Sequence, residues 1–483
     1  MNRRLVIRML GTILLILSGC MVPSLLISLW HGGSDAPALL ESALITAAAG
    51  LPMRFLAKPV NNNLRAREGF LTVALAWICM SLFGCLPFLF SGFLPSFFDA
   101  FFEACSGFST TGSTVVTDFE HMPMGITFWR SFTHWIGGMG VLVLALAIVP
   151  QVTGRTSYLV KAESPGPSLS KIAPKMTDSS KILYLIYTGL SLLMFVVLLL
   201  CGLTPYDAAI QTFGTAGTGG FSNYAASVGA FHSPTVELVV TVFMFLFGTN
   251  LSLYYGLFQG KWKDFVKSEE LRWYAGINLS AILIILVLIL PSYHGDVATA
   301  LRHSAFNVAT ISSTSGFVVN DYALWPVAAR ALIIILMFFG SCTGSTAGGI
   351  KTLRIVLVLK QAKREVVRAF SPRRVSVIRF EGRGVEERML HQTAVFVFLY
   401  VAIVLLGGFL VSLEGHYDLE TNFTAALTCV SNVGPGFGAV GPTGNFAGYG
   451  PFAKMVLSLL MLAGRLELFP ILILFHPSVW RKT

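Results

Sequence analysis

The sequence predicts an all-α polytopic membrane protein in which two transmembrane helices precede four tandem repeats. Three observations predict this fold. The 483 residues are 54% hydrophobic but only 12% charged, whereas a soluble domain carries about 25% charged residues. The mean hydropathy is +0.71, and apolar segments reach the roughly 20 residues that a bilayer-spanning helix needs. Finally, one short run of small and polar residues recurs four times between these segments.

Residues 1–68 are expected to form the two helices that precede the repeats. Val6–Trp30 and Ala36–Leu56 are apolar, a short polar turn separates them, and neither contains the recurring run. Three arginines within the first eight residues give the start of the chain the look of a signal peptide. Because no clear small-residue cleavage site follows, we expect this segment to remain as the first transmembrane helix.

Each repeat is expected to contain a spanning helix, a half-length helix, a turn and a second helix. A short helical segment in a membrane protein suits a re-entrant element better than a span. Non-helical backbone after it is tolerated at membrane depth only where it contacts protein or lines a water-filled cavity. We expect the second helix to be continuous except in the third repeat. By residue number, the repeats are 69–150, 182–258, 272–365 and 390–476, and the cytoplasmic loops between them are 151–181, 259–271 and 366–389.

The recurring run ends in a glycine in all four repeats. Its copies begin at Asp99, Asp207, His303 and Thr421 and align without a gap. A glycine after a small polar residue suits backbone that turns out of a helix and exposes its carbonyl groups. Four such turns around one axis would form a ring of carbonyl oxygens, the device that selects cations in potassium channels. The sequence thus predicts helix–pore-helix–filter–helix repeats around one central pore. The candidate filter residues are Thr110, Thr111, Gly112, Thr218, Gly219, Gly220, Thr314, Ser315, Gly316, Asn432, Val433 and Gly434.

The charge pattern predicts which side of the membrane each loop faces. The net charge of +10 arises from Lys and Arg clusters between the repeats and at both ends of the chain, whereas acidic residues occupy the turn-bearing loops. The positive-inside rule then places both termini and the basic loops in the cytoplasm. We expect the basic run 351–388 to contact a cytosolic partner or anionic lipid rather than a nucleic acid. Half-length helices that enter from outside would point their negative C-terminal ends at the pore, which favours a cation.

A second set of glycines lies about halfway along the second helix of each repeat. In the third repeat, the segment 340–349 holds mostly small and polar residues and is not expected to stay helical. We expect an unwound intramembrane loop that obstructs the pore below the carbonyl ring and serves as its gate. The alternative is a contact between helices that needs small residues.

Arg465 is expected at mid-span in the fourth repeat, where a charge costs roughly 2.5–3.5 kcal/mol on insertion scales. Glu467 lies two residues further on, about 200° around a helix, so the two cannot share a face. We therefore expect carbonyl groups of the loop to accept hydrogen bonds from Arg465; the alternative is an ion pair between helices. The candidate gate residues are Gly344, Ser345, Thr346, Ala347, Gly348, Gly349, Lys351 and Arg465.

Together, the fourfold repeat, the four filter glycines, the segment GSCTGSTAGGIKTLR and the GRLE of the last helix resemble the Trk/Ktr/HKT superfamily of potassium transporters, most closely its bacterial TrkH branch. The resemblance covers essentially the whole chain. It implies potassium uptake across the bacterial inner membrane through a K⁺-selective, Rb⁺-permeable channel-like pore. It also implies gating by the loop and by a cytosolic nucleotide-binding subunit, TrkA. Further, it implies a homodimer in membrane lipid, with K⁺ as the transported ion and no cofactor of its own.

The filter departs from that of a potassium channel, which predicts modest selectivity for K⁺ over Na⁺. Each repeat keeps one glycine rather than a TVGYG segment, and the fourth repeat has Asn432 and Pro435. Whether transport is passive or proton-coupled is not decided by these residues.

Two other classes of protein remain as alternatives. A proton- or sodium-coupled secondary cation transporter can also use broken helices, although it normally shows inverted repeats, and these four run in the same direction. An enzyme would need a polar catalytic set, but the chain has no HExxH or GxSxG motif, and His134 beside Trp135 is interpreted as a packing residue. The seven cysteines lie in apolar or small-residue context without a CxxC pair, which favours packing over disulfides or a metal site.

Overall fold

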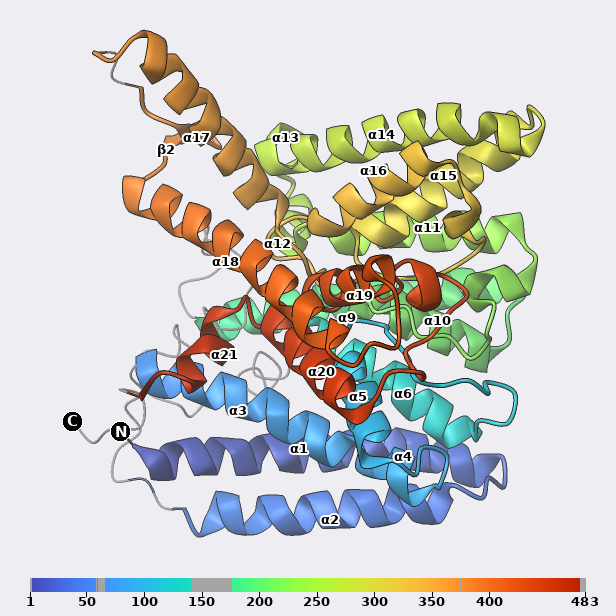
Figure 1. Cartoon of the computed structure of the whole chain (residues 1–483). Coiled ribbons are helices and arrows are strands. Elements are labelled where there is room, and N and C mark those ends of the chain that lie inside the picture. Colours follow the sequence, from blue (N-terminus) through green and yellow to red (C-terminus); the bar gives the residue numbers. More distant parts are fainter. Residues whose placement is uncertain (1, 58, 60–65, 141–175, 374–375, 478–483) are drawn as a thin grey trace.

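The computed structural model describes residues 2–57, 59, 66–140, 176–373 and 376–477. Nearly all regular structure in this part is helical, and long helices run roughly side by side across the molecule (Figure 1). Six described helical segments are long and apolar enough to cross a membrane, or seven if one bent pair counts as a single span. The prediction of an all-α polytopic membrane protein is therefore confirmed.

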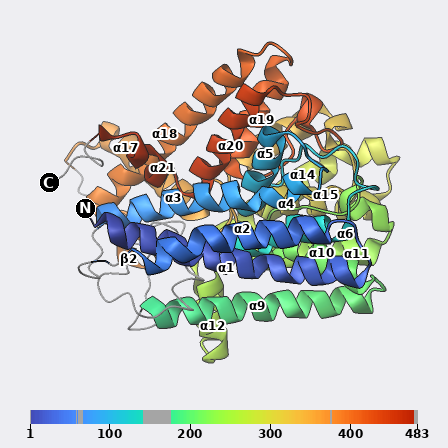
Figure 2. The same ribbon diagram turned by 90° about the horizontal axis from the view of Figure 1, so that it is seen from below.

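The two N-terminal helices are α1 (Arg3–Trp30) and α2 (Ala36–Phe55), close to the predicted bounds. They pack against each other along the lower edge of the molecule in Figure 1, and Figure 2 shows the pair from below. The turn between them is fixed by Asp35, whose carboxylate accepts hydrogen bonds from Ser28 Oγ and, at 2.9 Å, from the backbone N–H of Ile126. This contact attaches the pair to the first repeat.

Each repeat begins with a long apolar helix and continues with a shorter one. The long helices are α3 (Ala66–Gly84, extended by α4, Leu86–Phe90), α9 (Met176–Leu200), α14 (Glu269–Ile289) and α18 (Glu387–Ser412). The short helices have 12, 13, 16 and 13 residues: α5 (Phe97–Phe108), α10 (Pro205–Gly217), α15 (Val297–Ser312) and α19 (Leu419–Ser431). At 1.5 Å per residue they span about 18–24 Å, less than the roughly 30 Å of a bilayer core.

The second helices are all short as well, and this corrects part of the sequence prediction. They are α6 (Met124–Gly138), α11 (Pro234–Gly248), α16 (Val327–Phe338) and α20 (Pro451–Arg465). Continuous helices had been expected over 235–258 and 453–475. Instead, α12 (Leu251–Phe258) turns away from α11 by 90°, and α21 (Phe469–Leu474) follows α20 after a turn in which Glu467 and Leu468 have positive φ. The predicted continuation of the first repeat to residue 150 and most of the loop 151–181 lie outside the described residues.

The third repeat breaks as predicted, with the non-helical segment 339–351 between α16 and α17 (Thr352–Phe370). Around the repeats lie α13 (Trp262–Lys267) and a hairpin of β1 (Arg379–Phe380) and β2 (Arg383–Gly384). Short 3₁₀ turns complete the described elements: η1 (Ser227–Phe231), η2 (Leu290–Tyr293), η3 (Tyr322–Leu324) and η4 (Gly438–Val440).

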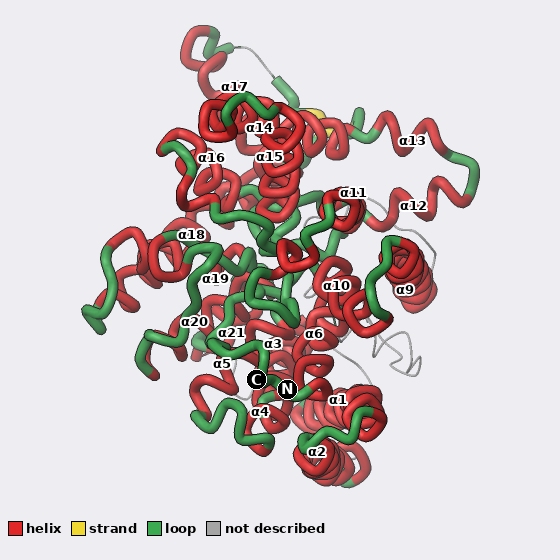
Figure 3. Tube along the Cα trace, turned by 90° about the vertical axis from the view of Figure 1, so that its right-hand side faces the viewer, coloured by secondary structure: helices red, strands yellow, loops and turns green. Residues whose placement is uncertain are grey.

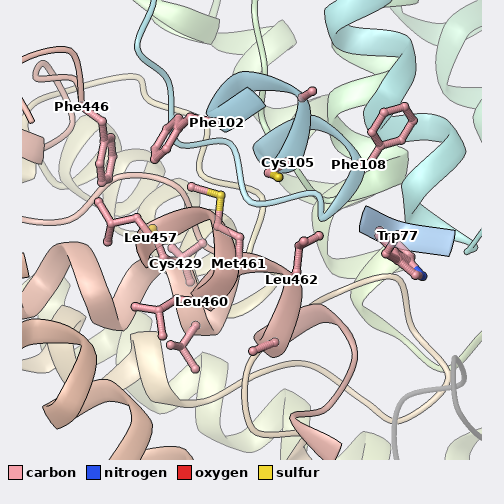
Figure 4. Packing of buried hydrophobic residues seen from close by; sticks show 14 of the residues in the cluster. Trp77, Phe102, Cys105, Phe108, Cys429, Phe446, Leu457, Leu460, Met461 and Leu462 are labelled. Carbon is pink, nitrogen blue, oxygen red and sulfur yellow. The ribbon is translucent and has the colours of Figure 1, made fainter. Parts of the chain in front are cut away.

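The repeats close into a ring because each second helix packs against the short helix of the next repeat. The contacting pairs are α6 with α10, α11 with α15, α16 with α19, and α20 with α5. Figure 3 looks along the long helices and shows the repeats surrounding a common middle. The closure from the fourth repeat to the first has an apolar part, in which Phe102 and Phe108 of α5 lie in one buried cluster with Leu457 and Met461 of α20 (Figure 4). In a bilayer, contacts of this kind are stabilised by close van der Waals packing rather than by removal of apolar surface from water. Lys454 of α20 also pairs with Asp99 of α5.

Candidate functional site

The four recurring runs adopt nearly the same backbone turn. The residue two places before the last glycine has a left-handed conformation in every repeat, which is uncommon outside glycine. Their φ values are 57° at Thr110, 57° at Thr218, 57° at Thr314 and 55° at Asn432. The last glycines are also left-handed, with φ of 83° at Gly112, 74° at Gly220, 70° at Gly316 and 104° at Gly434. The alignment made from sequence is thus matched by the backbone geometry.

One hydrogen bond ends all four short helices in the same way. The N–H group of the residue after the left-handed position donates to a carbonyl five residues earlier, the bond that defines a Schellman cap. The donors and acceptors are Thr111 to Ser106 (2.9 Å), Gly219 to Gly214 (2.8 Å), Ser315 to Thr310 (2.8 Å) and Val433 to Thr428 (3.0 Å). Because the helix stops there, the carbonyl groups that follow are free of the helical ladder.

The turns meet in a closed circle. A Cβ atom built on each last glycine would lie against a carbonyl oxygen of a neighbouring repeat, so only glycine fits. The built Cβ atom of Gly112 lies against Gly219 O, that of Gly220 against Ser315 O, that of Gly316 against Val433 O, and that of Gly434 against Thr111 O. Each repeat therefore contacts the next, and the fourth contacts the first. All four glycines line one cavity of about 170 Å³.

Side chains at the left-handed positions differ in their hydrogen bonds. Thr314 Oγ1 accepts from the backbone N–H of Gly348 at 2.8 Å, whereas Thr110 Oγ1 and Asn432 Oδ1 are buried and have no hydrogen-bond partner in the described part of the chain. The Asn432 amide donates to Thr111 Oγ1 at 2.9 Å, which joins the fourth repeat to the first. Unpartnered buried oxygens are costly in protein and are suitable ligands for a cation.

The segment 339–351 lies directly beside these turns and is buried. Ser341 Oγ donates to Ser312 O at 2.8 Å, and the Gly348 N–H bonds the Thr314 hydroxyl. A Cβ on Gly348 would collide with Ser431 O, just before the fourth turn. The predicted intramembrane loop therefore contacts the ends of the third and fourth short helices.

Two cations, the buried Lys351 and the partly buried Arg465, hold the loop by its carbonyl groups. Arg465 Nη1 donates to Thr346 O at 2.5 Å, the contact that the sequence led us to expect. Its Nη2 also donates to Gly137 O (2.7 Å) and Gly138 O (2.6 Å) of the first repeat, which was not foreseen. Lys351 Nζ donates to Ala347 O and lies 3.4 Å from Ser345 Oγ. Guanidinium has five donors and no acceptor, which suits this cluster of carbonyl oxygens.

A carboxylate that sequence reasoning missed holds the other side of the loop. Glu270 of α14 accepts hydrogen bonds from the Thr343 N–H (2.6 Å) and hydroxyl (2.8 Å). The loop also fills the break after α11, because Cys342 N donates to Gly248 O and Leu251 N donates to Gly344 O. The signal for Glu270 was available: a carboxylate near the start of an apolar helix usually faces a partner.

Two further contacts attach α17 and the β1–β2 hairpin to the same region. Glu467 pairs with Arg354 of α17 through two hydrogen bonds of 2.7 and 3.1 Å, not with Arg465. Glu381, at the tip of the β1–β2 hairpin, accepts from Ser268 Oγ (3.0 Å) and the Glu269 N–H (2.8 Å) at the start of α14. The hairpin therefore caps the helix that carries Glu270.

Comparison with known proteins agrees with this geometry. The TrkH family model, described as a cation transport protein, matches residues 36–482. The Trk system potassium uptake proteins TrkH of Salmonella typhimurium and Escherichia coli K12 are 34% and 33% identical to this chain over 487 residues, covering 100% of both. The chain belongs to the TrkH family. The crystal structure of the potassium transporter TrkH from Vibrio parahaemolyticus matches with a TM-score of 0.90 at 32% identity and covers 100% of each chain.

TrkH family membership confirms the resemblance seen in the sequence and identifies the chain as a cation transport protein of the membrane. The roles of individual filter and gate residues stay predictions, for which the geometry above supplies the physical basis. No group of three or more His, Cys, Asp or Glu side chains that could hold a metal ion occurs among the described residues.

Proposed function

We propose that this chain takes up potassium through a pore whose filter is the ring of four turns. The observation that carries the proposal is the closed circle of contacts in which each glycine lies against a carbonyl of its neighbour. The carbonyl groups in these contacts belong to Thr111, Gly219, Ser315 and Val433. Such a ring replaces the hydration shell of a monovalent cation. The names of the relatives, potassium uptake proteins, support K⁺ as the cargo.

The ring favours K⁺ and accepts Rb⁺ because its turns are held by caps and by their neighbours. Four C-terminal helix ends add negative potential around it. Na⁺ is smaller and needs the oxygens to move inward, which the shared contacts resist. Since each repeat supplies one short turn rather than a long filter, we expect the preference for K⁺ over Na⁺ to be modest.

The segment Gly344–Gly349 closes this pore at rest. Its carbonyls are bonded by Arg465 and Lys351, so positive charge lies beside the ion path as well as backbone. Conduction then requires the loop to leave the ring, and the bonds to Arg465, Lys351 and Glu270 set the cost of that movement. Hydrogen bonds to charged groups contribute about 1.5–3 kcal/mol each.

A cytosolic nucleotide-binding subunit of the TrkA type would control the loop through the cytoplasmic elements. Two routes lead from there to the gate: Arg354 to Glu467, beside Arg465, and Glu381 to the α14 cap that carries Glu270. Nucleotide binds that subunit rather than this chain. We further propose a homodimer in the bacterial inner membrane, with both termini in the cytoplasm as the basic loops indicate.

The decisive experiment is ion flux into liposomes that hold the purified protein. A pore passes K⁺ down its gradient with no other substrate, and the rates should fall in the order K⁺ and Rb⁺, then Na⁺ and Li⁺. Adding the nucleotide-binding subunit should change the rate without changing this order. Flux that requires a proton or sodium gradient would instead identify a secondary cation transporter.

A further inference from the structure

An ion pair of the first repeat is buried beside the ring, next to the second repeat. Arg130 of α6 and Glu103 of α5 are 1% and 0% exposed, and their Nε and Oε1 atoms are 2.6 Å apart. Removing two charges from water costs several kcal/mol per ion, and apolar residues of similar size are often as stabilising. A pair so deeply buried therefore suggests a role in specificity.

Glu103 holds the backbone that leaves the first turn. Its Oε1 accepts from the Thr114 hydroxyl at 2.9 Å, and its Oε2 accepts from the Val115 N–H at 2.9 Å. These residues follow Gly112 by only two and three positions. The carboxylate thus fixes where the chain of the first repeat passes after the ring.

Arg130 holds the same part of the second repeat. Its Nη1 donates to Ser222 O at 3.0 Å, and its guanidinium carbon lies 3.5 Å from the centre of the Phe221 ring. Phe221 and Ser222 directly follow Gly220. A guanidinium over an aromatic face gains cation–π attraction, more so when it is desolvated. We call the residues that directly follow each turn its exit: Thr114 and Val115 in the first repeat, Phe221 and Ser222 in the second. The ion pair therefore connects the exits of two neighbouring turns.

The residues that align with Glu103 in the other repeats make no such bridge. Gln211 and Asn307 bond the exit of their own repeat, through Ser222 Oγ at 3.0 Å and Asn320 Oδ1 at 2.7 Å. The fourth repeat has Ala425 at this position. In the described part of the chain, an ion pair thus occupies this position in the first repeat only, and Arg130, Thr114, Phe221 and Ser222 all line the cavity outside the ring.

We propose that Arg130 and Glu103 are positioning residues that set the ion preference of the pore. The proposal rests on the function assigned to the ring. The pair fixes the separation of the first and second turns, and hence the width that the carbonyl oxygens offer to an unhydrated ion. Because its charges compensate each other, it does so without adding a net charge at the pore mouth.

Removing either charge of the pair should change total cation flux in opposite directions but change the K⁺ to Na⁺ flux ratio in the same direction. Arg130→Gln leaves a carboxylate beside the cavity, which attracts cations, so total cation flux should rise. Glu103→Gln leaves a guanidinium there, and total flux should fall. Both variants free the turn exits, so both should lower the K⁺ to Na⁺ flux ratio, by about fivefold as expected for groups that act as a unit. The double variant should restore total flux toward wild type but not the ratio.

The matched control is Arg302→Gln, which breaks an ion pair at 2.7 Å between Arg302 of the third repeat and Glu237 of the second, away from the residues that follow the turns. It should keep the wild-type ratio. Arg130→Lys keeps the positive charge but lacks the planar guanidinium that bonds Glu103 and Ser222 O together. Its K⁺ to Na⁺ flux ratio should therefore lie between those of Arg130→Gln and the wild type. All proteins are compared as purified, monodisperse samples in liposomes. Wild-type ratios in both Arg130→Gln and Glu103→Gln would overturn the inference, whereas a wild-type protein without K⁺ preference would overturn the function of the ring itself.

Discussion

At the ring, the four repeats share one backbone conformation, whereas just below it they break their second helices in different ways. The left-handed residues of the four turns have φ between 55° and 57°. By contrast, the break after α11 is a 90° bend, the break after α16 is the loop 339–351, and the break after α20 is a tight turn at Glu467 and Leu468. An ion on the axis needs the same oxygens from every side, so the turns must match.

The region below the ring has no such requirement, and its parts are specialised. The third repeat supplies the loop, the fourth supplies Arg465, and the first supplies two carbonyl oxygens that orient this guanidinium. A gate needs one movable part and fixed parts that hold it, which a symmetric arrangement cannot provide. We therefore propose that the symmetric turns serve ion selection and that the asymmetric region below them serves gating.

The largest effect should come from breaking the symmetry of the ring. Gly316→Ser places a side chain where φ is 70° and where Val433 O is already in contact. Strain of about 1–3 kcal/mol corresponds to roughly 5–150-fold, so the K⁺ to Na⁺ flux ratio should fall by about tenfold or more. Gly189→Ala is the control, since a Cβ at Gly189 meets nothing within 4 Å. An unchanged ratio in the Gly316→Ser protein would contradict the filter assignment.

The next effect should come from releasing the loop. Arg465→Gln removes the charge that holds Thr346 O, and deletion of 344–349 removes the obstruction itself. Both should raise K⁺ flux several-fold and weaken its dependence on the nucleotide-binding subunit. Arg330→Gln, which breaks an exposed pair with Glu420, should have no such effect. If the deletion variant folds, dimerises and conducts no faster than wild type, the loop is a packing element.

A smaller effect is expected at Glu270. Replacing it with Gln keeps the size of the side chain but weakens its bonds to Thr343, so resting flux should rise by a few-fold at most. Glu237→Gln is a matched control, because Glu237 also lies in the first turn of a membrane helix but pairs with Arg302. Equal flux in the two variants would exclude Glu270 from the gate.

The smallest effect concerns the outer ends of the short helices. Asp418 caps α19 by accepting from Thr421, and hydrogen bonds from the Thr421 side chain and backbone lower the pKa of this carboxylate below its ordinary 3.8. A lowered pKa in the folded state adds stability above pH 3.8 that is lost as the pH falls through the folded pKa. Asp418→Asn should thus lower the melting temperature slightly at neutral pH. The difference from wild type should shrink as the pH falls below 3.8, and a difference independent of pH would argue against this cap.

The sequence predicted the ring better than the breaks, for a physical reason. The turns are encoded locally, by a glycine and a small polar residue at fixed spacing, and such turns form from short-range interactions. The bend at Thr249 is different: its local signal is only the short run Gly248-Thr249-Asn250, in which Asn250 caps α12, and the break depends also on the loop that satisfies Gly248 O and Leu251 N. Likewise, nothing in the sequence of α20 specifies a left-handed Leu468.

Some hydrogen-bond partners of the charged residues could not be predicted from neighbouring sequence either. Arg465 was singled out because an intramembrane charge needs a partner, and one of its partners was foreseen from the polar loop. Gly137 and Gly138 were not, because they come from another repeat and only the closed ring brings them to Arg465. Glu103 and Arg130 carried the same signal, a charge within an apolar segment, and that rule would have found them.

The most direct test of the central claim is to locate the ion. A structure of the wild-type protein in Rb⁺, with anomalous scattering measured at the rubidium edge, should show a peak on the axis of the ring. The peak should be equally close to the carbonyl oxygens of Thr111, Gly219, Ser315 and Val433, and Gly316→Ser should weaken it. A wild-type peak away from these oxygens, or no peak in the ring at saturating Rb⁺, would contradict the account.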